Sequence, residues 1–270
     1  GVGKSTLFSN LFIRSIEWPS MATRPRIVPV GPTLRILEQT VTFDLGGISF
    51  SARLVDTPGY GDALDLSRTF SLATNYIERC FRQSLVHERR FSRVERSERE
   101  RHLGVDAVLY FIAPHRIKPV DIAFLKRLQG RTSIVPILAK ADSMTADELR
   151  SFRADVVYAL EAAGIEVAHP PLAIICATDI HPQAPKRGRR YPWGVAHSED
   201  PQLPHSQLPQ LRRFLLIDGL SALKEASHRH YEGYRRHALW RAQVGVAPVL
   251  RALIPPPALI AACLLLPQPR

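Results

Sequence analysis

Gly1-Val2-Gly3-Lys4-Ser5-Thr6 opens the chain and matches the second half of a phosphate-binding loop, G-x-x-x-x-G-K-[ST]. In such a loop the backbone N–H groups surround the phosphates, the lysine reaches the β- and γ-phosphates, and the hydroxyl binds Mg²⁺. We therefore predict that a nucleoside triphosphate is held by Gly1, Gly3, Lys4, Ser5 and Thr6, with Ser5 as a Mg²⁺ ligand. The first glycine of the loop and its preceding strand would lie upstream, so we expect a truncated N-terminus.

Composition and charge narrow the class of protein. With 270 residues, 45% of them hydrophobic, the chain can bury a large core and is not a disordered protein. Its formal net charge of +11 favours acidic partners such as nucleotide phosphates, anionic lipids, nucleic acid or an acidic protein, and does not choose among them. The three cysteines, Cys80, Cys176 and Cys263, have neither a metal-binding spacing nor an obvious disulfide framework, which favours a reducing compartment.

Apolar strand-like runs alternate with helical stretches along the chain, which predicts an α/β fold with a mainly parallel sheet. Two of the expected strands are joined at paired glycines, which predicts a hairpin. Further along, a loop-rich insertion from Asp179 to Pro209 precedes a last helical region from Leu211 to about Arg241. The strands are expected at 41–43, 48–55, 105–113, 134–139 and 172–176, and the helices at 6–12, 121–128 and 146–163, with Thr145 as an N-cap.

Two further motifs lie at expected strand ends. In Leu54-Val55-Asp56-Thr57-Pro58-Gly59, Asp56 can hold Mg²⁺ through water and the Gly59 N–H can contact a γ-phosphate. In Ala139-Lys140-Ala141-Asp142, Asp142 can accept two hydrogen bonds from guanine N1–H and its 2-amino group, a donor pair that adenine lacks. Each motif alone has an ordinary structural interpretation, but their order after a phosphate loop favours a GTP site.

A second hydroxyl ligand for Mg²⁺ should come from the segment before the hairpin. Thr33 follows Gly31-Pro32 and is freer to reach the nucleotide than Thr40, which lies where strand alternation has begun. For either residue the alternative is an ordinary threonine in a strand. On chemistry alone, Thr33 can be either a Mg²⁺ ligand or an ordinary strand residue. For Thr40 the ordinary strand residue is the better interpretation.

Several stretches together resemble the septin GTPases. These are Asp56-Thr57-Pro58-Gly59-Tyr60-Gly61-Asp62, the A-K-A-D motif at 139–142, Gly188-Arg189-Arg190-Tyr191-Pro192-Trp193-Gly194 and His230-Tyr231-Glu232-Gly233-Tyr234-Arg235. The A-K-A-D and G-R-x-Y-P-W-G forms are specific to septins among P-loop GTPases, and the resemblance covers about residues 1 to 237. It implies a P-loop NTPase (Ras-like) three-layer α/β/α domain with a septin-type C-terminal helical extension. Thr33 then aligns with the switch threonine of hydrolysing septins, which favours a catalytic role.

The resemblance also implies a GTP-binding cytoskeletal protein of the cytoplasm that forms filaments, with division-site or membrane association. Septin subunits contact one another through a face that contains the nucleotide and through an opposite face that contains the terminal helices. By position, Arg189 would contact the guanine and Trp193 would pack in the nucleotide-side interface. The opposite interface would lie near Tyr231, Glu232 and Arg235. Without the resemblance, Trp193 and Tyr231 would be assigned to packing within the chain.

Departures from the septin pattern fall in three places within the GTPase domain and in the C-terminal tail, which lacks the heptad coiled coil common in septins. Pro114-His115-Arg116-Ile117-Lys118-Pro119 is two residues shorter than the usual septin loop, so His115 and Arg116 are interface candidates, and Arg116 could approach a partner's phosphates. Cys176-Ala177 replaces a typical Gly-Ser at the base-binding loop. Tyr60 stands where other GTPases place a water-positioning glutamine, so we expect slow hydrolysis.

The expected organisation is a GTPase domain at 1–237 and a Pro-rich apolar tail at 238–270 without fixed structure. The last apolar run, Ala258 to Leu266, has nine residues against the roughly 20 that span a bilayer. The cofactors are GTP or GDP with Mg²⁺, and the partners are like subunits or other septins and anionic lipid, with nucleic acid not expected. The alternatives are a switch or transport GTPase acting as a monomer or dimer, and a scaffold that binds nucleotide without hydrolysing it.

Overall fold

The structure is a computed structural model of the chain, and it describes residues 7, 10–11, 36–45, 48–57, 66–89, 104–176, 188–192, 194–200 and 202–253. The chain forms two compact units, Gly1–Tyr231 and Glu232–Arg270. The predicted paired glycines at 46–47 lie outside the described residues.

The predicted hairpin is confirmed and is longer than the sequence analysis places it. Strands β1 (Leu37–Leu45) and β2 (Ile48–Asp56) are antiparallel, with Leu37 opposite Asp56 and Leu45 opposite Ile48. The start of β1 was not predicted, because its polar residues interrupt the apolar alternation by which a strand is recognised in a sequence. Asp56 is the last residue of β2.

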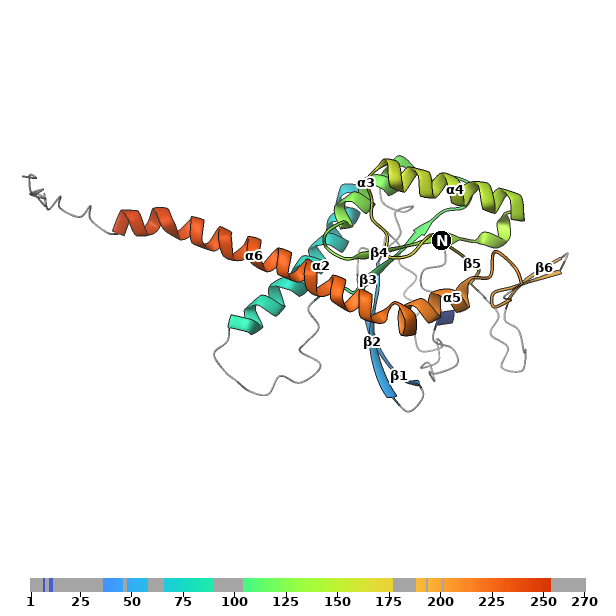
Figure 1. Cartoon of the computed structure of the whole chain (residues 1–270), viewed down its shortest axis with the longest axis horizontal. Coiled ribbons are helices and arrows are strands. Elements are labelled where there is room, and N and C mark those ends of the chain that lie inside the picture. Colours follow the sequence, from blue (N-terminus) through green and yellow to red (C-terminus); the bar gives the residue numbers. More distant parts are fainter. Residues whose placement is uncertain are drawn as a thin grey trace, which may run out of the picture. The chain divides into compact units, whose positions relative to one another are not determined.

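Within the described part of the chain, three parallel strands form the central sheet in the order β3-β4-β5. They are β3 (Ala107–Ile112), β4 (Ser133–Ala139) and β5 (Leu172–Ile174). All seven residues of β4 are buried, as expected for a parallel strand covered on both faces. Figure 1 shows α3 (Pro119–Leu128) and α4 (Ala146–Ala162) over one face of this sheet and α5 (Leu208–Arg213) on the other.

The predicted cap of α4 is confirmed. The Thr145 side chain accepts a hydrogen bond from the Glu148 backbone N–H, and Glu148 accepts one from the Thr145 backbone in return. Helix α2 (Leu66–Arg89) was not among the expected helices. Its buried side chains Phe70, Ile77 and Phe81 follow helical spacing.

The predicted loop-rich insertion from Asp179 to Pro209 contains a second hairpin that the sequence analysis did not predict. Strands β6 (Gly188–Tyr191) and β7 (Gly194–His197) pair antiparallel, and a Cβ at Gly188 would overlap the Ala196 carbonyl oxygen. Their polar sequence gave little strand signal, because the hairpin has few apolar positions.

The C-terminal helical region begins with α5, continues as a π-helical turn, η5 (Phe214–Asp218), and then as α6 (Leu220–Leu253). Helix α6 extends beyond residue 237, so the helical part of the chain reaches further than the sequence analysis places it. The boundary between the two compact units falls within this helix, after Tyr231.

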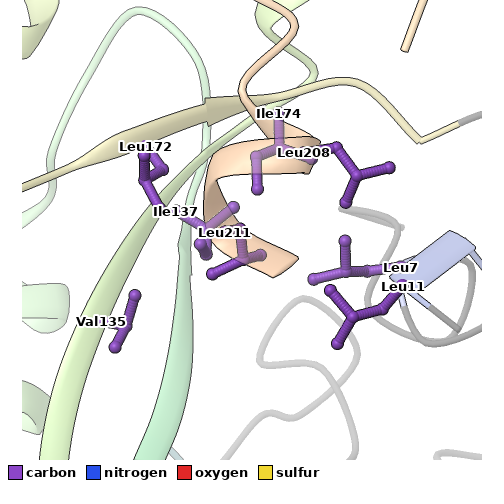
Figure 2. Close-up of a cluster of buried hydrophobic side chains, with 8 residues drawn as sticks. All are labelled: Leu7, Leu11, Val135, Ile137, Leu172, Ile174, Leu208 and Leu211. Atoms are coloured by element: carbon purple, nitrogen blue, oxygen red, sulfur yellow. The ribbon is translucent and has the colours of Figure 1, made fainter. Parts of the chain in front are cut away.

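The core below the sheet joins the phosphate-loop helix to α5. Figure 2 shows Leu7 and Leu11, from the described part of that helix, facing Leu208 and Leu211 of α5. Alternate strand residues complete the cluster: Val135 and Ile137 from β4, and Leu172 and Ile174 from β5. Every member is at most 2% exposed, so Leu7 and Leu11 are packed in the core between the sheet and α5.

Candidate nucleotide-binding site

The candidate site residues leave the sheet at one edge. Lys140 follows β4, and Cys176 lies two residues after β5. Because Ala139 pairs with Ile174 in parallel register, both segments emerge side by side. Ligands of open α/β sheets bind outside the carboxyl ends of the strands, so this edge is the expected place for a nucleotide.

A tight turn after β4 positions Asp142. Lys140 has a left-handed backbone with φ of 51°, and its carbonyl accepts hydrogen bonds from the Ser143 N–H at 2.9 Å and the Ser143 hydroxyl at 2.8 Å. This turn begins the short 3₁₀ helix η4 (Ala141–Ser143). It leaves Lys140 exposed and turns Asp142 inward.

Asp142 is a buried carboxylate whose two oxygens differ. Its side chain is 1% exposed, and Oδ2 accepts hydrogen bonds from Arg189 Nη1 at 3.3 Å and from the Tyr191 hydroxyl. Among the described residues, Oδ1 has no hydrogen-bond partner although it is buried. A buried acceptor of this kind needs a donor, and a guanine N–H would supply one. Asp142 therefore fits the base that the sequence predicts.

Arg189 and Tyr191 come from the same face of β6, because residues two apart on a strand point the same way. The Arg189 guanidinium lies 5.8 Å from the centre of the Tyr191 ring. Burial and the hydrogen bond to Asp142 raise the pKa of Tyr191, so its hydroxyl stays protonated and donates. The predicted site residues Asp142 and Arg189 are thus brought together.

Sequence reasoning did not assign Tyr191 a role in the site. The available signal was its spacing of two residues from Arg189, which places the two side chains together only if the segment is a strand. Since the segment was expected to be irregular, the signal was not used.

Cys176 lies beside these groups. Burial raises the pKa of its thiol to about 12, with Arg189 and Asp142 close enough to shift it in opposite directions. The side chain also packs against the core cluster that contains Leu7 and Leu11. Cys176 thus places a neutral thiol next to both the core cluster and the Asp142 carboxylate.

Arg212 of α5 contacts the backbone of the helical residues Asn10 and Leu11. Its guanidinium donates to the carbonyl of Leu11 at 2.8 Å and of Asn10 at 3.0 Å, and pairs with Glu199 at 2.9 Å. These contacts tie α5 to the described helical residues Asn10 and Leu11, which follow the predicted phosphate loop in the sequence.

Most residues predicted to bind phosphate lie outside the described residues; these are Gly1, Gly3, Lys4, Ser5, Thr6, Thr33 and Gly59. Asp56 is described and ends β2, where a metal-binding carboxylate is expected. Thr40 is an exposed residue within β1, in line with its interpretation as an ordinary strand residue.

Of the interface candidates, His115 and Arg116 are exposed on the turn after β3, and His115 has a left-handed φ of 65°. Tyr231 is 0% exposed and its ring lies 5.9 Å from that of Phe81, so it packs inside its own chain. Its role at an interface would be indirect. Glu232 and Arg235 form a partly exposed ion pair at 3.3 Å, and Trp193 lies outside the described residues.

Comparisons with known proteins match this architecture. The family model for Septin matches residues 1–173 and 167–247. The chain is 31% identical to Septin-1 of Drosophila melanogaster over 88% of this chain and 72% of that protein. It is 31% identical to Protein peanut of the same species, covering 87% of this chain and 47% of that protein.

A solved septin GTPase domain from Chlamydomonas reinhardtii superposes with a TM-score of 0.66 at 27% identity, over 87% of this chain and 94% of the other. The fold is therefore that of an α/β P-loop NTPase, as predicted. The chain belongs to the septin family and is a septin-type GTP-binding protein. Among the described helices, none is long and apolar enough to cross a membrane.

Proposed function

We propose that this protein binds GTP and GDP with Mg²⁺, hydrolyses GTP slowly and assembles into septin-type oligomers and filaments. The observation that carries the nucleotide part is the buried Oδ1 of Asp142, which has no hydrogen-bond partner among the described residues. This oxygen lies at the carboxyl edge of the sheet and suits a guanine N–H donor. Membership of the septin family supports the assembly part.

In this proposal the base is read by Lys140 and Asp142, with Arg189 beside them. Asp142 accepts hydrogen bonds from the N–H donors of the guanine edge, and adenine lacks this pair of donors. The exposed Lys140 side chain extends along the base in the manner of guanine-binding lysines. Arg189 contributes a planar cation that can lie against the base.

At the phosphates, we assign Lys4 to the β- and γ-phosphates and Ser5 and Thr33 to Mg²⁺. Asp56 holds the metal through water, and the Gly59 N–H contacts the γ-phosphate. When bound, Mg²⁺ neutralises charge between the phosphates during phosphoryl transfer. Tyr60 in place of a water-positioning glutamine supports slow turnover.

For assembly, we assign one interface to the nucleotide side and the other to the terminal helix. Exposure of His115 and Arg116 supports the first, with Trp193 as a further contact. Glu232 and Arg235 belong to the second, next to Tyr231. The expected setting is the cytoskeleton, and the net charge of +11 supports contact with anionic lipid as a further interaction.

The test is to release bound nucleotide from the purified full chain and to size the same sample in high and low salt. Guanine nucleotide together with polymers in low salt is the expected result. Nucleotide with only monomers or dimers would favour a switch or transport GTPase. Polymers that never convert GTP in single turnover would favour a hydrolysis-dead scaffold, and an empty monomer in both salts would contradict the proposal.

A further inference from the structure

The unequal use of the two Asp142 oxygens has a consequence for how the base is read. Each carboxylate oxygen can accept about two hydrogen bonds. Oδ2 already accepts two, from Arg189 and Tyr191, while Oδ1 accepts none from the described residues. A guanine edge offers two neighbouring N–H donors, and a carboxylate receives such a pair with one donor on each oxygen.

One of the two present donors must therefore leave Oδ2 when guanine binds. The Arg189 bond is long at 3.3 Å, and its side chain is 31% exposed on a flexible stem. The Tyr191 hydroxyl also donates to Oδ2, and it is carried on a ring with only two side-chain torsions to move. Arg189 is thus the partner that exchanges, and Tyr191 is the partner that stays.

We propose that the Tyr191 hydroxyl is a positioning residue for guanine recognition, which holds the Asp142 carboxylate in the orientation that accepts both base donors. Arg189 occupies the carboxylate in the empty site and moves onto the base when guanine replaces it. The inference rests on the proposed guanine-nucleotide binding. It extends that function by assigning the roles of the two β6 side chains in base specificity.

The two roles predict different changes in base preference. A carboxylate that has lost Tyr191 can rotate, so it keeps one good hydrogen bond to the base and not both. Guanine has the N1–H and the 2-amino donors, whereas hypoxanthine has the N1–H alone. Loss of the Tyr191 hydroxyl should then weaken the binding of GDP more than the binding of IDP, its hypoxanthine analogue. Loss of Arg189 should weaken both equally.

The experiment measures the Kd of GDP and of IDP for the nucleotide-free full chain and for the variants Tyr191→Phe and Arg189→Met. Tyr158→Phe, on the exposed face of α4, is the matched control for loss of a tyrosine hydroxyl. We expect Tyr191→Phe to raise the Kd of GDP about tenfold, as for loss of one hydrogen bond to a charged group, and to raise that of IDP by less. Arg189→Met should leave the GDP-to-IDP ratio unchanged.

Three results would overturn the inference: Tyr191→Phe binding GDP as tightly as the wild type or more tightly, equal losses for both nucleotides, or an Arg189→Met variant that loses the preference for GDP. If Tyr191→Phe does not fold, the ratio in Arg189→Met decides. A folded wild type that binds neither nucleotide would instead overturn the proposed function itself. These outcomes distinguish failure of the Tyr191 inference from failure of the proposed nucleotide binding.

Discussion

Asp142 combines burial, negative charge and an oxygen available for a ligand donor. Its side chain is 1% exposed, and both described partners approach the same oxygen. Such an acceptor discriminates strongly, because a base that presents an acceptor instead of a donor leaves a buried group unsatisfied. Single substitutions at this edge of the sheet should therefore change which nucleotide binds.

Asp142→Asn should exchange guanine for xanthine preference. The amide N–H₂ would face the 2-amino group of guanine donor to donor, whereas xanthine presents a carbonyl oxygen at the same place. We expect GDP affinity to fall at least about 100-fold and XDP to bind more tightly than GDP. Competition binding with both nucleotides measures this, with Asp147→Asn on the exposed surface of α4 as the control. An unchanged order of affinities would remove Asp142 from base recognition.

The Cys176 thiol should react slowly in the folded protein. Burial disfavours the thiolate, so the folded pKa of about 12 lies above the ordinary value of 9.0. At about pH 8 the thiolate fraction is then lower by about 1000-fold than in the unfolded chain, and it rises only as the pH approaches the folded value. Iodoacetamide alkylation of the Cys176 peptide, followed by mass spectrometry with and without urea, tests this. Equal rates in both conditions would contradict it.

At the scale of elements, two contacts come from segments far apart in sequence. Hairpin β6–β7 supplies Arg189 and Tyr191 to the turn after β4, and α5 supplies Arg212 to the helix that follows the phosphate loop. In the proposed function, the first arrangement would serve the base and the second would support the phosphate side. The C-terminal part of the first unit thus contacts both the turn after β4 and the helical residues at 10–11.

Arg212→Met should lower the free energy of unfolding by about 2 kcal/mol, since it removes charge-assisted hydrogen bonds to two helix carbonyls and leaves the partly buried Glu199 without its cation. The neighbouring Arg213 is more exposed and pairs with Asp218, so Arg213→Met should change stability by less than about 0.5 kcal/mol. Urea unfolding of both variants gives the comparison. Equal effects would mean that the Arg212 contacts to Asn10, Leu11 and Glu199 add nothing to stability.

At the scale of the whole molecule, assembly is expected to depend on exposed charge at the nucleotide side. His115 and Arg116 are exposed on the turn after β3. We expect Arg116→Ala to raise the protein concentration needed for low-salt polymers about tenfold, since a contact at an interface centre contributes roughly 1–2 kcal/mol. Sedimentation measures this.

The matched control for that substitution is Arg150→Ala. Arg150 is also exposed, but it lies on α4 and pairs with Asp147 of the same helix. A loss of polymers in both variants would indicate a general effect of charge. Unchanged assembly in Arg116→Ala would place this turn away from the contact.

The sequence was sufficient for the family, the α/β class and the position of Lys140 and Asp142, because these depend on short motifs and on local periodicity. Continuous apolar runs predicted β3, β4 and β5, and the Thr145 cap marked the start of α4. Polar strands were harder. Hairpin β6–β7 was not predicted within the loop-rich insertion, because its strands are held by backbone pairing and show no apolar alternation in the sequence.

Only the tertiary structure brought Tyr191 to Asp142, joined Arg212 to the Leu11 carbonyl 201 residues earlier, and buried Tyr231 against Phe81. Local sequence carries the preferences of the backbone, whereas these contacts depend on which distant segments share a sheet edge or a core. A carboxylate in a motif predicts what it could bind. Its burial, and the donors that already occupy one of its oxygens, arise from packing between elements that no local pattern encodes.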